Sequence, residues 1–196
     1  MGQYYITGIR KQNNKRFKAY ESDRGLKLME HSYIGNFFMQ FICKQIEDCP
    51  SYVIWCGDYF DPDEDIIKAD CSSDTSGFDA RLLWKHKASE WEWHDGDTFD
   101  YKGKYLVNLD AKTYLSFDEY IETCMLGKLR DPGWVVHPLS LLTANSNGKG
   151  GGDYYEEELN ADVVGSWCDC LLVITSNKPD SSFTDVTQDV LFEERN

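Results

Sequence analysis

The sequence predicts an α+β protein: a single domain over residues 1–196, with a mixed or mainly antiparallel sheet, two or three helices and an acidic insertion. Three observations support this fold class. A length of 196 residues suits one well-buried core. Short runs of aromatic and β-branched residues, bounded by turn signals, are typical of strands. A long segment with helical periodicity separates the first two runs from the third, so a hairpin, a helix and a returning strand open the chain.

The first 60 residues predict a β-hairpin, one helix and a third strand. Residues 3–9 and 17–20 form the arms of the hairpin, on either side of a basic turn. Apolar residues recur at spacings of three and four from residue 26 to about residue 46, which predicts one helix with Gly35 as its weak point. Residues 52–55 then form a short apolar strand.

The remaining elements follow from local composition. Residues 58–80 are acidic with few apolar anchors, which predicts a long loop or insertion. Residues 101–115 predict a hairpin with arms at 105–108 and 113–115. Beyond the insertion we also expect a strand at 91–93, a helix capped by Ser116 or Asp118 and running to about Gly127, a brief strand at 134–136, a short helix at 139–142, a buried strand at 167–175 and an acidic, frayed tail at 177–196.

The charge balance disfavours direct nucleic-acid binding. The chain carries 34 acidic and 20 basic residues, a net charge of −14, and such a surface repels phosphates within a Debye length. A basic cluster at Arg10, Lys11, Lys15, Arg16 and Lys18 is interpreted as a solvated hairpin turn rather than a phosphate-binding patch. The excess acid favours a basic protein partner, including proteins that themselves bind nucleic acid.

Cysteine usage and the N-terminus indicate a soluble protein of a reducing compartment. The seven cysteines show no zinc-type spacing, and Cys168 and Cys170 alternate along an apolar run as buried small residues do. No secretory signal opens the sequence and no apolar run approaches 18 residues. We therefore expect a cytoplasmic protein with no membrane partner, no cofactor and no metal; the acidic residues after Asp58 lack the glycine and the glutamate of a calcium loop.

The most distinctive segment is the glycine-rich stretch within residues 145–167. Four glycines in five positions carry an entropy cost that is tolerated where the backbone needs a positive φ or a close approach. The spacing fits neither a Walker phosphate loop nor a dinucleotide fingerprint. An anion-binding nest, a mobile binding loop and a purely structural crossing stay open. The candidate binding residues are Gly148, Lys149, Gly150, Gly151, Gly152, Asp153 and Tyr154, with Trp55 and Tyr59 as aromatic anchors.

An enzymatic alternative rests on two histidines and two carboxylates near the ends of expected elements. His31, Asp58, His137 and Asp153 could bind a divalent metal or supply an acid and a base for hydrolysis if the fold brings them together. No spacing requires this, and His31 is also explained as a helix residue packed against aromatics. The alternative function is a metal-dependent hydrolase or a nucleotide-binding enzyme.

Seven segments resemble an uncharacterised family of proteins from Firmicutes, gut bacteria, their prophages and their phages. They occur in the family's order and are MGQYY at 1–5, GLKLMEHSYIGN at 25–36, WCGDY at 55–59, KYLVNLDAKTYL at 104–115, HPLSLLTA at 137–144, NGKGGGDYY at 147–155 and VGSW at 164–167. The acidic stretch 60–80 and the tail after Ser176 lie outside the resemblance. No activity is established for that family, so the resemblance implies only a bacterial or phage intracellular setting.

Charge, the missing catalytic signature and this resemblance together favour a non-enzymatic accessory protein of phage or mobile-element type. Its partner would be a basic host protein, such as a nucleic-acid-binding nuclease of a defence system, inhibited as an anti-CRISPR protein inhibits its target. The sequence does not identify this partner and leaves the oligomeric state open.

Overall fold

The strands of the N-terminal part follow the sequence pattern. A computed structural model describes residues 2–14, 16–22, 26–60, 98–126, 135–145, 148–154 and 162–190. Strands β1 (Tyr5–Lys11) and β2 (Lys18–Glu21) form the predicted hairpin, and β3 (Ser51–Gly57) pairs with β1 along its whole length. Two helices, α1 (Leu28–His31) and α2 (Phe37–Ile46), connect β2 to β3.

The C-terminal part supplies the second half of the sheet. Strands β4 (Tyr105–Asn108) and β5 (Thr113–Ser116) form the predicted hairpin, and α4 (Phe117–Leu126) begins directly after it. The Ser116 side chain accepts a hydrogen bond from the Glu119 amide, as the predicted cap requires. The remaining elements are α5 (Pro138–Thr143), β6 (Ala144–Asn145), β7 (Leu171–Thr175) and β8 (Thr184–Asp185).

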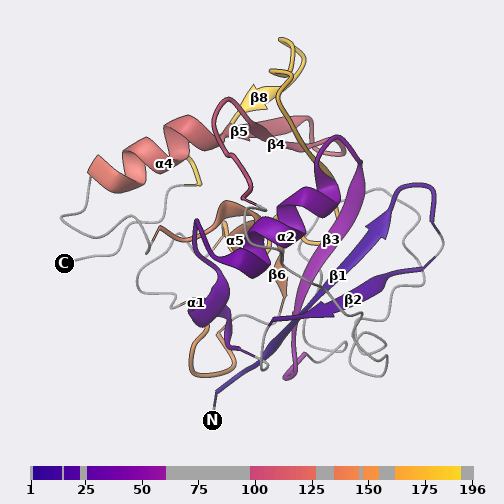
Figure 1. Ribbon diagram of the computed structural model, residues 1–196, viewed down its shortest axis with the longest axis vertical. Coiled ribbons are helices and arrows are strands. Elements are labelled where there is room, and N and C mark those ends of the chain that lie inside the picture. The colour runs from indigo at the N-terminus through magenta and orange to yellow at the C-terminus, as the bar shows by residue number, and fades with distance from the viewer. Residues whose placement is uncertain are drawn as a thin grey trace.

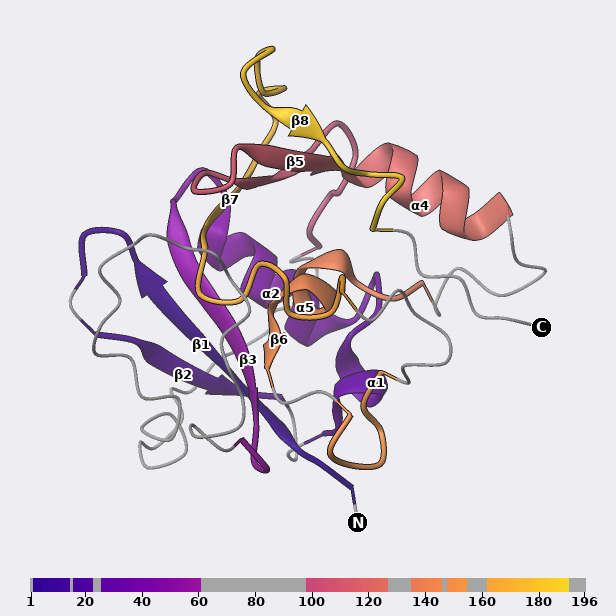
Figure 2. The ribbon, with the colours of Figure 1, turned by 180° about the vertical axis from the view of Figure 1, so that it is seen from behind.

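The described strands form one mixed, open sheet, so the chain is a single-domain α+β protein as the sequence predicts. Its order is β2-β1-β3-β7-β4-β5-β8, with β6 paired to β3 off this path. The β3–β6 and β5–β8 pairs are parallel, and the other pairs are antiparallel. Figures 1 and 2 show the strongly twisted sheet, with α2 and α5 together over its middle and α4 beyond its β5 end.

The main core lies between the sheet and the helices. Alternate residues of β1 and β3 point to this side, and Tyr5, Ile9, Val53 and Trp55 pack there against α2 and α5. The opposite face carries two smaller apolar clusters, one around Ile54 and one of Val107, Tyr114 and Val173. Each face of the sheet therefore carries buried apolar side chains, and the larger cluster lies under the helices.

One continuous helix over residues 26–46 is a wrong prediction. The helix stops after His31, and residues 32–36 cross to Val136: the Ile34 amide donates to the Val135 carbonyl at 2.8 Å. Gly35 lies at φ +89°, which allows the chain to turn before Asn36 caps α2 through the Met39 amide. The weak point predicted at Gly35 is a full break.

The predicted strand 167–175 and frayed tail also need correction. Residues 162–169 form turns, Asp169 at φ +58° ends them, and only Leu171–Thr175 is strand. Residues 178–190 are part of the fold: β8 pairs with β5, and Val190 is buried. The predictions for 61–80, 91–93 and Trp134 lie outside the described residues.

Two further expectations concern thiols and membranes. Cys168 and Cys170 are both buried as predicted, but only Cys168 is a free thiol, because Cys170 is disulfide-bonded. That bond is at odds with the expected reducing compartment. Among the described helices, none is long and apolar enough to cross a bilayer.

Candidate functional site

The glycine loop is a structural crossing between three chain segments. Its Gly151 carbonyl accepts from the Gln3 amide at 3.2 Å, and its Gly152 carbonyl accepts from the Met29 amide at 2.9 Å. Gly2 forms an isolated β-bridge with Gly151, and Tyr4 forms another with Lys27. The N-terminus, the start of α1 and the loop therefore run side by side. Figure 1 shows the loop in orange beside α1. Of the three hypotheses for this loop, the geometry supports the structural one.

Asp153 occupies the anion nest that the glycines form. One carboxylate oxygen accepts from the amides of Gly148 and Gly150, at 2.9 and 3.0 Å. Asp153 is buried, and burial raises its pKa, while the glycine amides and the neighbouring Tyr5 hydroxyl act in the opposite direction. The nest thus binds the chain's own carboxylate, which removes the reason to expect an external anion there.

Tyr154 is a core residue rather than a binding residue. Its hydroxyl donates to the Ser32 hydroxyl at 2.8 Å and lies 3.1 Å from the Ser140 hydroxyl. The side chain is fully buried, so burial raises its pKa and keeps the phenol neutral. Tyr154 joins the break after α1 to the start of α5, and it can contact no partner in this position. Lys149 is half-buried and Gly151 exposed, so these two remain accessible in the loop.

The crossing predicts which glycines tolerate alanine. A Cβ at Gly152 would lie 2.5 Å from Lys27 Cδ, with the backbone at φ +92°, and a Cβ at Gly150 would lie 2.8 Å from the Gln3 amide nitrogen. We expect Gly150→Ala and Gly152→Ala each to lower the free energy of unfolding by about 1–2 kcal/mol or more. Gly151, one of the candidate binding residues, has no positive φ and is exposed.

Gly151→Ala is therefore the matched control, with an expected change within about 0.5 kcal/mol. Urea denaturation of the three variants measures these differences. Equal losses in all three would show that the loop is held by something other than close backbone packing.

His31 serves the core. Its Nε2 atom accepts from the Trp55 indole N–H at 3.1 Å, and the ring packs edge-on against Phe38. Burial lowers the pKa of His31 to about 4, although the Lys27 backbone raises it slightly. Trp55 is itself fully buried, so its predicted role as an exposed aromatic anchor is wrong.

His137 is the N-cap of α5. Its Nδ1 atom accepts from the Leu139 amide at 3.1 Å, which leaves the imidazole proton on Nε2. Nε2 lies 3.3 Å from the Cys43 sulfur, so the N–H donates to that sulfur. A histidine in this tautomer cannot take a proton from the thiol, and burial raises the pKa of Cys43 and lowers that of His137 to about 3. The pair is therefore not an activated cysteine nucleophile.

The four residues of the enzymatic alternative do not form one site. His31, His137 and Asp153 are buried with separate partners, while Asp58 is exposed and exchanges two hydrogen bonds with the Tyr4 backbone. Within the described ranges, no group of three or more metal-ligating side chains lies close enough to bind an ion. Tyr59, beside Asp58, is half-buried. The geometry gives the hydrolase alternative no support.

Within the part of the chain that the structure describes, a groove beside α4 is a surface feature that the sequence did not reveal. It has a volume of about 760 Å³ and lies between the segment 99–102 and α4. The apolar residues lining it are Phe99, Tyr101, Ile121 and Met125, and the charged ones are Asp100, Lys102, Asp118 and Glu122. Met125 is 40% exposed, although it belongs to a helix that buries Phe117 and Tyr120. The missed signal was Met125, an exposed apolar residue one turn after Ile121, which is itself partly buried against the core.

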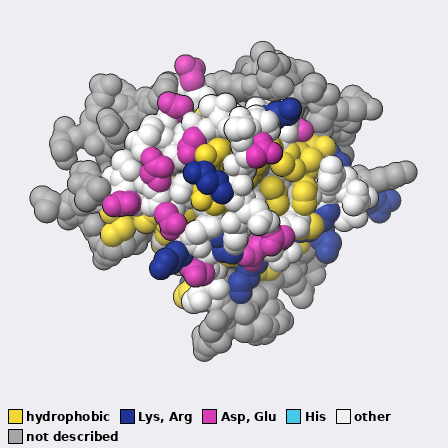
Figure 3. Space-filling view, turned by 90° about the horizontal axis from the view of Figure 1, so that it is seen from above, with side chains coloured by type: hydrophobic (Ala, Val, Ile, Leu, Met, Phe, Trp, Pro, Cys, Tyr) yellow, Lys and Arg dark blue, Asp and Glu magenta, His cyan; other side chains and the backbone are white. Residues whose placement is uncertain are grey.

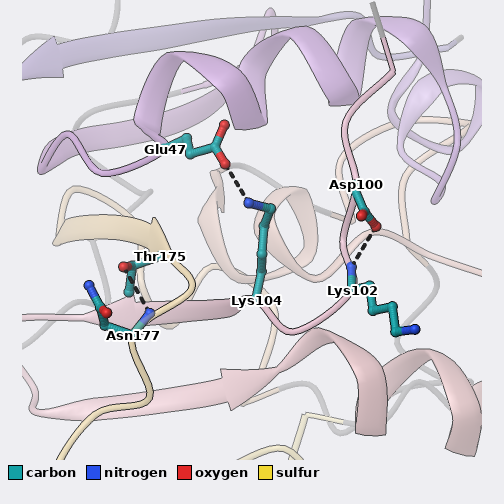
Figure 4. A network of polar contacts seen from close by, with 6 residues as sticks. All are labelled: Glu47, Asp100, Lys102, Lys104, Thr175 and Asn177. Carbon is teal, nitrogen blue, oxygen red and sulfur yellow. Dashed lines mark hydrogen bonds and ion pairs between the residues drawn. The ribbon is translucent and has the colours of Figure 1, made fainter.

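The segment that forms one wall of the groove is held in place at several points. The Phe99 amide donates to the Gln40 side chain at 2.7 Å, and the Gly103 amide donates to Asp118 at 2.9 Å. Figure 4 shows Lys104 paired with Glu47 at the end of α2, and Asp100 accepting from the Lys102 amide. The wall is preorganised, which lowers the entropy cost of binding.

Acidic side chains border this groove and continue along α4. Asp118, Glu119 and Glu122 are exposed on the helix. Asp185, in β8, and Asp189, in the segment after β8, are exposed as well. Figure 3 views this side from above and shows acidic side chains gathered on its left, where α4 lies, with apolar side chains between them. An apolar floor with an acidic border is the combination that a basic, partly apolar protein segment would fit.

No family model, curated protein or solved structure matches this chain. The resemblance to phage and gut-bacterial proteins stays a prediction.

Proposed function

We propose that this chain is a small acidic binding protein that docks a basic, amphipathic segment of another protein in the α4 groove. The single observation behind this function is the groove itself. Tyr101, Ile121 and Met125 offer apolar surface next to the buried ring of Phe99, and three carboxylates outnumber the one lysine, Lys102, around it. A helix with apolar residues on one face and Lys or Arg beside them would bury its apolar residues in the groove and pair its cations with the carboxylates at the border. The net charge of −14 adds long-range attraction.

The partner class follows from charge. A basic host protein that binds nucleic acid, such as a nuclease, presents the lysines and arginines that this groove would recognise, and occupying them would compete with nucleic acid. Met125 suits such a site because the flexible thioether adapts to different apolar side chains. Inhibition of a defence nuclease is the specific role proposed within this class.

The test uses a labelled 14-residue amphipathic helix of leucine and lysine, and its glutamate counterpart as the control peptide. We expect the basic peptide alone to bind, with an affinity that falls as NaCl is raised, because exposed charge pairs are screened. Glu122→Lys and Met125→Lys should each weaken binding about tenfold or more. Glu21→Lys makes the same charge change as Glu122→Lys, but on β2 at the opposite edge of the sheet. This control should change binding less than threefold.

Amide chemical-shift changes locate the peptide. They should concentrate at residues 99–102 and 118–125. Shifts elsewhere, or equal binding of the acidic peptide, would contradict the proposed function.

A further inference from the structure

A second, basic pocket lies at the β1–β2 hairpin. It has a volume of about 70 Å³ and is lined by one aliphatic residue, Ile9, and by Lys11, Asn14, Arg16, Lys18, Tyr20 and Gln45. Lys11 ends β1, Lys18 begins β2, and Gln45 belongs to the last turn of α2. The hairpin and α4 lie on opposite sides of the molecule in both ribbon views (Figures 1 and 2). This pocket is therefore independent of the α4 groove and of the function proposed for it.

Among the residues that the structure describes, the three cations of this pocket have no charged partner. Although the chain contains 34 acidic residues, the side chains of Lys11, Arg16 and Lys18 form no ion pair or hydrogen bond in the part of the chain that the structure describes. Three like charges around one small space repel one another. A protein with this many carboxylates could have neutralised them, so the unpaired cluster needs an explanation other than composition.

Neutral donors complete the lining. Asn14 and Gln45 carry side-chain amides. Tyr20 is buried, and its ring packs edge-on against Phe41, with 5.3 Å between the two ring centroids. Burial raises the pKa of Tyr20, so its hydroxyl keeps the proton and can donate. Arg10 stiffens the hairpin from the other sheet face: its guanidinium lies 3.9 Å from the Tyr52 ring centroid and donates to the Asn14 carbonyl at 3.4 Å.

We propose that this pocket binds the phosphate group of a small phosphorylated ligand. Its volume of about 70 Å³ has room for a single tetrahedral oxyanion and leaves the rest of the ligand outside. Arg16 supplies a planar fork for two phosphate oxygens, and the two lysines supply point charges. The C-terminal end of α2, beside Gln45, carries about half a negative charge from the helix dipole and so repels an anion. The three full positive charges of the pocket outweigh this repulsion.

A small ligand fits better than a nucleic acid. A polyanion would extend from the hairpin over the surface of a protein with a net charge of −14, whereas one phosphate group meets only the local cations. The sequence-based interpretation of this cluster as a solvated turn is compatible with its position but does not explain the enclosed, cation-lined space.

Calorimetric titration tests this site with inorganic phosphate and with ATP in magnesium-free buffer at low ionic strength. We expect both to bind the natural protein. Arg16→Gln should weaken binding about tenfold or more, since one charge-assisted pair is lost. Lys178→Gln removes an equal charge from an exposed position after β7 and should change binding less than twofold.

A charge-conserving variant separates a built site from general attraction. Arg16→Lys keeps the charge but loses the fork, so a built site predicts weaker binding, of about threefold or more. Equal binding by Arg16→Lys and the natural protein, equal losses in Arg16→Gln and Lys178→Gln, or tighter binding of a 12-nucleotide single strand than of ATP would each overturn the proposed site. Arg16 and Lys178 are both exposed, and thermal melting checks that the three variants remain folded.

Discussion

Lowering the pH from 7 to 4.5 is expected to unfold this protein, mainly because two buried histidines must stay neutral in the fold. Burial lowers the pKa of His31 to about 4 and that of His137 to about 3. An unfolded histidine has a pKa near 6.5, so below that pH the unfolded state binds more protons than the folded state. The stabilisation is complete above pH 6.5 and is lost as the pH falls toward the folded-state values.

The expected size of the effect is large. Each histidine contributes a slope of about 1.4 kcal/mol per pH unit, so the two together remove about 4 kcal/mol between pH 6.5 and pH 5. This is comparable to the whole stability of a small domain, about 5–15 kcal/mol. Asp153 acts in the opposite sense, because its raised pKa means that the folded state takes up a proton more readily, but it is one group against two. Urea denaturation at intervals between pH 7.5 and 5 measures the slope.

Two variants assign the slope to its residues. His137→Asn keeps an acceptor for the Leu139 amide at the N-cap, and His31→Gln keeps one for the Trp55 indole, while neither side chain titrates. Each variant should be less stable than the natural protein at pH 7 but should lose about half of the pH slope. An unchanged slope in both variants would mean that carboxylates, not these histidines, control acid unfolding.

The elements that the sequence predicted well are those whose residues interact locally. The β4–β5 hairpin, the cap at Ser116 and the start of α4 follow from turn residues and periodicity within residues 101–126, and the structure confirms them. Local signals suffice there because each partner lies within a few residues along the chain.

The errors occur where distant segments decide the outcome. The break after α1 exists because Ser32 and Ile34 hydrogen-bond to the segment around Val136, about 100 residues away. Likewise, residues 178–190 look like a frayed acidic tail in the sequence. In the fold, the Thr187 amide and hydroxyl donate to Asp185, and the hydroxyl accepts from the Ser116 amide at 2.9 Å. No local periodicity encodes such pairings.

The candidate site shows the same limit in chemical terms. His31, His137, Asp153 and Tyr154 looked functional because polar residues in apolar context can be catalytic, yet each one satisfies a buried backbone or side-chain group. The α4 groove escaped notice because the exposure of Met125 depends on which face of the helix the rest of the fold covers. Residue type suggested that the polar candidates were functional and that the apolar groove residues were core, whereas burial in the fold shows the opposite arrangement for Tyr154 and Met125.

Replacing Asp153 with alanine is expected to destabilise the fold by about 2–4 kcal/mol, since two amides lose a charged acceptor. Gly148 and Gly150 direct their N–H groups at one Asp153 oxygen, and the loop they form holds the N-terminus against α1 through Gly151 and Gly152. Asp153→Asn retains an amide oxygen that can accept both bonds, so it should cost about 1 kcal/mol, the ordinary value for neutral hydrogen bonds. Thermal and urea unfolding of the two variants give the comparison.

The alanine variant also tests whether the loop is an anion nest filled from within. Removing the carboxylate leaves the Gly148 and Gly150 amides around a space of carboxylate shape, so formate or acetate should restore part of the lost stability in a saturable way. Sodium chloride at equal ionic strength should not, and neither anion should stabilise Asp153→Asn, whose amide still fills the nest. Stabilisation by chloride to the same extent would indicate general screening. If formate gives no rescue although alanine is strongly destabilising, Asp153 acts through packing against Tyr5 rather than through the glycine amides.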